Sequence, residues 1–185
     1  IISDKGLVLT NHHCGFSVIQ KHSTVEHDYL SNGFWAYKYS EELPNPGITA
    51  SILQRMEDVT DQVNAVLNDN MSEEERAAAI DAISKQISAK AVQGTNLQAQ
   101  VQEMFEGNQF FLFYKIYRDV RLVGAPAQSM GKFGGDTDNW SWPRHTADFC
   151  MMRIYTGPDG EPAPYNTSNV PLKPKHHLPV SAKGV

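Results

Sequence analysis

A helix-like segment lies between two regions that read as β-strands, and this order restricts the folds open to the chain. From about residue 57 to 93 the sequence is rich in Ala, Glu, Gln and Lys. Ser72 followed by Glu75 three residues later is typical of a helix N-terminus, and the isoleucines between residues 80 and 87 recur at helical spacing. We therefore predict a helical excursion at about 57–93, inserted into a β-framework.

Apolar segments rich in β-branched and aromatic residues flank this excursion. A turn signal at residues 4–6 divides the first ten residues and predicts a hairpin, and Gly-Asn at 107–108 is a second hairpin signal. The proline-rich tail from residue 157 to 185 is expected to form loops around a short strand. Further strands are predicted at 33–39, 48–56, 97–105 and 109–126, and from Asp148 onward. The expected fold class is mainly β with an α insertion.

Composition narrows the function classes. The 185 residues include 16 Lys and Arg against 21 Asp and Glu, a net charge of −5. No basic stripe interleaves with aromatic residues, so nucleic acid is not an expected partner. No apolar run approaches the roughly 20 residues that a membrane helix needs, so no membrane span is expected. Since the chain opens with Ile inside an apolar segment, we expect a piece of a longer protein.

Two adjacent histidines, His12 and His13, stand before Cys14 at the end of the first apolar run. Metal binding is a weak interpretation, because neighbouring residues on a strand face opposite sides and no zinc-type spacing accompanies them. No metal or cofactor is therefore expected. A plainer interpretation is one exposed histidine beside one whose hydrogen bonds are satisfied at a strand end. The second pair, His176 and His177, is read as part of a solvated loop.

The segment LTNHHC is similar to the strand end that carries the general base in chymotrypsin-like serine peptidases. There a histidine directly precedes a cysteine, so His13 is the predicted base and His12 takes the place of an alanine. Such a base needs a carboxylate behind its Nδ1. Asp136 and Asp138 lie in a Gly-rich loop, where turn roles are common. We predict Asp148, at the start of an apolar strand, as the partner of His13.

Longer motifs extend this similarity to most of the chain. It resembles the bacterial dipeptidyl-peptidases of the type 7 and type 11 group, chymotrypsin-like serine exopeptidases of Gram-negative bacteria, in the segments GLVLTNHHCG (6–15), LSNGFWA (30–36) and FGGDTDNWSWPRHTADF (133–149). The resemblance implies a partial trypsin-like peptidase domain over residues 1–185. It further implies that this domain holds the first barrel of a chymotrypsin-like double β-barrel, with a helical excursion.

The resemblance also assigns roles to individual residues. His13 and Asp148 correspond to the catalytic histidine and aspartate, and Asn139 and Trp140 to residues that help to hold the free N-terminal amine of the substrate. An amide carbonyl can accept a hydrogen bond from an ammonium group, and an indole face can flank it. For Trp142 we prefer burial of apolar area in a packed loop. The serine nucleophile of Gly-Asn-Ser-Gly type is absent, so the piece is expected to be inactive alone.

The expected function is the N-terminal segment of a serine-type dipeptidyl-peptidase. In the periplasm or cell envelope of a Gram-negative bacterium, it would release dipeptides through an acyl-enzyme from peptides that have a free N-terminus. One alternative is a non-catalytic module on the same fold that binds peptide termini. A zinc protein is another, built on His12, His13, Cys14 and Cys150.

Several properties stay open at this point. Cys14 and Cys150 could form one bridge, remain two free thiols, or pair with a partner outside the chain. The side-chain preference next to the scissile bond and the role of the helical insertion are also undetermined. A homodimer of the longer protein is left open.

Overall fold

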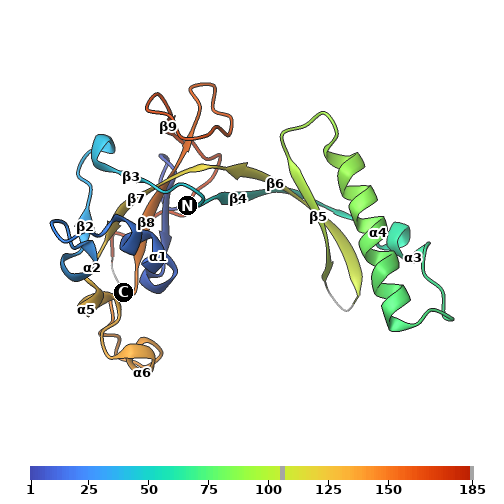
Figure 1. The fold of residues 1–185 in the computed structure, drawn as a ribbon, viewed down its shortest axis with the longest axis horizontal. Coiled ribbons are helices and arrows are strands. Elements are labelled where there is room, and N and C mark those ends of the chain that lie inside the picture. Colours follow the sequence, from blue (N-terminus) through green and yellow to red (C-terminus); the bar gives the residue numbers. More distant parts are fainter. Residues whose placement is uncertain (105–106, 184–185) are drawn as a thin grey trace. The chain divides into compact units, whose positions relative to one another are not determined.

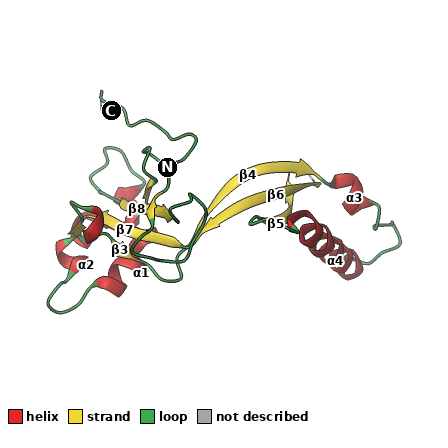
Figure 2. Ribbon diagram, turned by 90° about the horizontal axis from the view of Figure 1, so that it is seen from above, coloured by secondary structure: helices red, strands yellow, loops and turns green. Residues whose placement is uncertain are grey.

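Two compact units make up the chain, one inserted into the other. The computed structural model describes residues 1–104 and 107–183. The first unit consists of Ile1–Ala50 with Tyr117–Val185, and the second of Ser51–Ile116. Both are drawn in Figures 1 and 2. The inserted unit is wider than the helical stretch at 57–93, because it includes a three-stranded sheet of its own.

An open sheet forms the centre of the first unit (Figure 1). Its strands are β1 (Leu7–Thr10), β2 (Phe34–Trp35), β3 (Leu43–Pro44), β7 (Asp119–Ala125), β8 (Cys150–Thr156) and β9 (Val170–Pro171). Their order is β1-β8-β7-β2, with β3 also paired to β7 and β9 to β8, and all of these pairs are antiparallel. The described residues thus confirm a mainly β fold with helices, but they form no closed barrel.

Short helices connect these strands. They are α1 (His12–His22), α2 (Tyr29–Asn32), the 3₁₀ helix η1 (Tyr39–Glu41), α5 (Gln128–Gly131) and α6 (Gly135–Asn139). The prediction that the two histidines end a strand is wrong, because β1 stops at Thr10 and His12 begins α1. Both histidines therefore lie in the first turn of a helix.

Two strand predictions near the N-terminus need correction. Within residues 1–10 only the second half is a strand; the Ile2 N–H donates to the Leu7 carbonyl across the turn (2.8 Å), but the first residues join no sheet. The strand predicted at 33–39 shortens to β2, which η1 follows. Its alternating aromatic residues do not mark a buried face, since Tyr37 is 87% and Tyr39 46% exposed.

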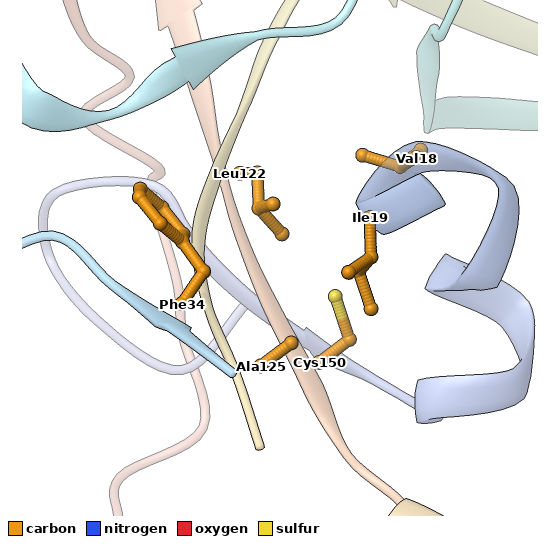
Figure 3. Packing of buried hydrophobic residues seen from close by; sticks show 6 residues of the cluster. All are labelled: Val18, Ile19, Phe34, Leu122, Ala125 and Cys150. Carbon is orange, nitrogen blue, oxygen red and sulfur yellow. The ribbon is translucent and has the colours of Figure 1, made fainter. Parts of the chain in front are cut away.

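Helix α1 packs on the sheet through a small apolar core. In Figure 3 the side chains of Ile19, Leu122 and Cys150 point toward one another. A Cβ at Gly15 would lie 2.7 Å from the Cys150 Sγ, so a larger residue could not be placed there without moving α1 away from β8. The complete cluster contains Val18, Ile19, Phe34, Leu122, Ala125 and Cys150. This packing fixes the N-terminus of α1 beside the start of β8.

The second unit is a small sheet with helices. Its elements are β4 (Ala50–Asp58), α3 (Thr60–Asn64), α4 (Glu73–Val92), β5 (Gln98–Met104) and β6 (Asn108–Tyr117). The strand order is β4-β6-β5, and β5 pairs antiparallel with β6. The predicted hairpin at Gly107 is confirmed by the pairing of Met104 with Asn108, although residues 105 and 106 lie outside the described part.

Of the stretch predicted to be helical at about 57–93, residues 60–64 form α3 and residues 73–92 form α4, whereas residues 57 and 58 belong to β4. Helix α4 lies alongside β5 (Figure 2). The Ser72 hydroxyl accepts a hydrogen bond from the Glu75 N–H (3.3 Å), and the Glu75 carboxylate accepts one from the Ser72 N–H (2.9 Å). This reciprocal pair satisfies the free amides at the helix start. Three isoleucines, Ile80, Ile83 and Ile87, pack against the buried cluster of Val59, Val63 and Phe113. No described helix is both long and apolar enough to cross a membrane.

Candidate active site

The ends of two neighbouring strands bring the predicted site residues together. Strands β1 and β8 are antiparallel, and their last pair is Thr10 with Cys150. The C-terminal end of β1 therefore lies beside the N-terminal end of β8. His13 follows the first strand and Asp148 precedes the second, so the two meet although 135 positions separate them. The strand itself begins at Cys150, two residues later than expected.

His13 and Asp148 share two hydrogen bonds. The His13 Nδ1 lies 2.7 Å from the Asp148 Oδ2, and the His13 backbone N–H donates to Oδ1 (3.1 Å). Because a carboxylate only accepts, Nδ1 carries the proton and the lone pair is left on Nε2. The His13 side chain is 61% exposed and the Asp148 side chain 5%. The imidazole can therefore be reached from solvent, while its carboxylate partner is sheltered.

Two asparagine amides complete the environment of the Asp148 carboxylate. Asn11 Nδ2 donates to Oδ2 at 3.1 Å, and Asn139 Nδ2 donates to the same oxygen at 3.0 Å. Burial of this carboxyl group raises its pKa, but the bonds from His13, Asn139 and Asn11 together outweigh burial, so the pKa of Asp148 is below its ordinary value. The carboxylate is thus held ionised and in one orientation.

Asn139 and Trp140 lie at the C-terminal end of α6, beside this pair. Trp140 is 76% exposed, and Arg144 Nη1 donates to the backbone carbonyl of Asn139. A pocket of about 520 Å³ is lined by all four predicted site residues together with His12, Phe16, Gln128, Gly131, Lys132, Gly135, Asp136 and Thr146. The structure therefore places His13, Asp148, Asn139 and Trp140 around one cavity.

The other candidates in this stretch are arranged differently. The Asp138 carboxylate accepts a hydrogen bond from Thr146 Oγ1 (3.3 Å), and Asp136 lines the pocket; neither side chain is bonded to His13. The prediction that Trp142 buries apolar area is wrong for this chain, because its side chain is 81% exposed.

His12 has an environment that the sequence did not reveal. It is 2% exposed, and a Cβ at Gly131 would lie 2.5 Å from its ring, so the glycine lets the imidazole pack against the backbone. Burial lowers the pKa of His12, which favours the neutral ring. Its Nε2 has no hydrogen-bond partner among the described residues. The plainer interpretation of the pair is therefore right that one histidine is exposed, but the Nε2 of the buried one is not satisfied by the described residues.

The cysteines are two free thiols in this structure, so of the three alternatives the bridge within the chain does not form. Cys14 is exposed, while Cys150 is buried and burial raises its pKa to about 11. In the described part of the chain no three His, Cys, Asp or Glu side chains group in a way that could hold a metal ion. The four-residue zinc alternative on His12, His13, Cys14 and Cys150 therefore lacks a matching cluster.

Known proteins resemble this chain in both sequence and fold. A family model described as Peptidase S46 matches residues 1–185. A Phocaeicola vulgatus protein named dipeptidyl-peptidase 7 is 51% identical over 191 residues, which cover 100% of this chain and 26% of that protein. An Asp/Glu-specific dipeptidyl-peptidase of Capnocytophaga gingivalis is 49% identical over 186 residues, covering 100% and 26%.

A solved structure shows the same similarity in fold. The crystal structure of Porphyromonas endodontalis DPP11 in complex with substrate has a TM-score of 0.87 and 41% identity to this chain, covering 100% of it and 28% of the other. The chain thus spans about a quarter of the length of these relatives. The match over the whole of residues 1–185 confirms the resemblance based on motifs, and the chain belongs to the peptidase S46 family.

Proposed function

We propose that the chain is the N-terminal segment of a serine-type dipeptidyl-peptidase that releases dipeptides from peptide N-termini through an acyl-enzyme. The 2.7 Å contact between His13 Nδ1 and Asp148 Oδ2 is the observation that carries the proposal. It supplies a general base whose tautomer is fixed and whose protonated form has a counter-charge. Relatives named as dipeptidyl-peptidases support the same activity.

The chemistry follows from the free Nε2 of His13. This atom would take the proton of the attacking serine hydroxyl and return it to the leaving amine, while Asp148 stabilises the imidazolium that forms in between. The serine and its oxyanion hole would belong to the part of the relatives' length that this chain does not match.

We further propose that the first unit contributes to the first barrel of a chymotrypsin-like pair of barrels. The enzyme would act in the periplasm or cell envelope.

The substrate's free N-terminus would bind at Asn139 and Trp140. Since the Asn139 Nδ2 donates to Asp148, its Oδ1 is the atom oriented to accept a hydrogen bond from an ammonium group. The exposed Trp140 adds a π face on the same pocket. Both groups lie beside the proposed base, so they would set the distance from the peptide N-terminus to the scissile bond.

The test uses the full-length protein and peptides with a cleavable fluorescent group after the second residue. His13→Ala and Asp148→Ala should each lower kcat/KM by about 10³-fold or more. His177→Ala, an exposed histidine away from the pocket, is the matched control and should keep wild-type activity. Acetylation of the substrate N-terminus should also abolish cleavage.

Two other outcomes would contradict the proposal. Binding of free-N-terminus peptides with no hydrolysis by the wild-type protein would favour the non-catalytic module. Hydrolysis that is unaffected by either substitution would refute the assignment of His13 and Asp148.

A further inference from the structure

Asn11 occupies a position where asparagine has a common role that it does not perform here. It is the N-cap residue of α1, and such a side chain usually accepts a hydrogen bond from an amide in the first helical turn. The Asn11 side chain makes no capping bond. Its Nδ2 instead lies 3.1 Å from the Asp148 Oδ2 and 3.4 Å from the Asp148 backbone carbonyl oxygen.

This contact continues the β1–β8 pairing beyond its last residue pair. The ladder ends at Thr10 with Cys150, where the chain turns into α1. The Asn11 amide then reaches across to both the main chain and the side chain of a residue 137 positions later. The Asn11 side-chain amide thus holds the Asp148 carboxylate together with the backbone carbonyl of the same residue, which restricts rotation of the carboxylate.

The oxygen that Asn11 contacts is the one that binds the imidazole. Oδ2 of Asp148 accepts from His13 Nδ1, Asn11 Nδ2 and Asn139 Nδ2, so the directions of these three donors determine where its lone pairs point. Asn139 lines the pocket, whereas Asn11 does not. Of the two amides, Asn11 can therefore act on the carboxylate without forming part of the substrate-binding wall.

We propose that Asn11 is a positioning residue that holds the Asp148 carboxylate, and through it the His13 imidazole, in the orientation needed for proton transfer. The inference rests on the function proposed above. The position requires a neutral donor of this length. An aspartate would place a second negative charge beside Asp148, and a serine would be too short to span the same distance.

The experiment compares Asn11→Ala, Asn11→Ser and Asn11→Asp in the full-length protein. Serine caps helices as well as asparagine does, so Asn11→Ser preserves any capping role but loses the reach to Asp148. We expect Asn11→Ala and Asn11→Ser to lower kcat about 10-fold to 100-fold, in line with the loss of a hydrogen bond to a charged group, and to leave KM within about twofold. The isosteric Asn11→Asp should lose more activity than either.

The pH profile of kcat/KM provides a readout that a merely structural role would not change. Without the Asn11 donor, Asp148 keeps more negative charge available to His13, so the imidazolium is stabilised and the acid limb should move to higher pH. Asn11→Asp adds a charge and should move it furthest. Gln20→Ala, an exposed residue of the same helix, is the control and should leave the profile unchanged.

The results separate the two proposals. If His13→Ala and Asp148→Ala abolish activity but Asn11→Ser retains the wild-type kcat and acid limb, the positioning role is refuted and the proposed function stands. If those two substitutions have no effect, the proposed function fails first. Thermal unfolding of each variant shows whether the fold is kept, and a lower melting temperature in Asn11→Ala that Asn11→Ser restores together with kcat would indicate a capping role instead.

Discussion

The two units of the chain differ in how deeply an ion pair is buried in each. In the first unit, Arg121 donates to the Asp119 carboxylate at 3.0 and 2.7 Å, and these side chains are 9% and 0% exposed. In the second unit, Lys85 and Asp81 form an ion pair whose side chains are 75% and 63% exposed. The first unit has fixed charges in its interior, and the second keeps this pair in solvent.

Further partners hold the buried charges in place. Asn169 Nδ2 donates to Asp119 (2.9 Å), and the Arg121 guanidinium lies 3.7 Å from the centre of the Tyr155 ring. Asp148 is held by the same means, by several donors on one sheltered carboxylate. Networks of this kind keep polar side chains in one orientation, which proton transfer requires. The Asp148 carboxylate of the candidate site lies in the first unit, as does the buried pair of Asp119 and Arg121.

The largest expected effect is on the buried pair. Arg121→Met leaves the Asp119 carboxylate without its cation in a dry site, and it should lower the local stability of β7 and β8 by about 3–5 kcal/mol. Amide hydrogen exchange of the full-length protein, followed by mass spectrometry, measures the change. Exchange in α4 is the internal control, and equal losses of stability in both units would show that the buried pair does not act on the first unit alone.

An intermediate effect is expected at the start of α4. Ser72→Ala removes the hydroxyl that caps the Glu75 amide, and it should lower the stability of this helix by about 1 kcal/mol. Ser72→Asp, which keeps an acceptor, is the matched control and should exchange like the wild type. Faster exchange in β8 after Ser72→Ala would show that the units are coupled more closely than their separate cores indicate.

The smallest effect is expected at the exposed pair. Lys85→Met breaks an ion pair one helical turn apart, and such pairs contribute only about 0.3–0.5 kcal/mol in solvent. The change in α4 exchange should therefore lie near the limit of detection and shrink further in high salt. A loss as large as that of Arg121→Met would overturn the contrast between buried and exposed charge.

The sequence predicted best what depends on neighbouring residues. The α4 helix carries its own start signal in Ser72 and Glu75 and its own apolar face, so its existence could be read locally. The short strand β2 could not, because the aromatic pattern at 33–39 gives no information about which side is covered. The mistaken strand end at His12 has the same cause, since an apolar run does not mark where a chain turns into a helix.

For the candidate site too, the sequence predicted the identity of residues better than their contacts. Motifs identified His13, Asp148, Asn139 and Trp140 because their residue types and spacing match a known group, and the structure places them around one pocket. Asn11 stands beside the histidines in the same motif, yet nothing in the sequence distinguished a helix cap from a contact with Asp148. Because a strand end was predicted at this position, the sequence indicated neither a helix cap nor a contact with Asp148, and only the position of the partner shows which bond Asn11 makes.

The sequence by itself determined the family, the central helix and the identity of the residues with reactive side chains, because these depend on local order and residue type. The tertiary structure decided which of them touch. The pairing of β1 with β8 brings residues 13 and 148 together, and the packing of α1 on Cys150 buries one histidine while exposing the next. Contacts between distant residues depend on strand register and burial, which no single segment encodes.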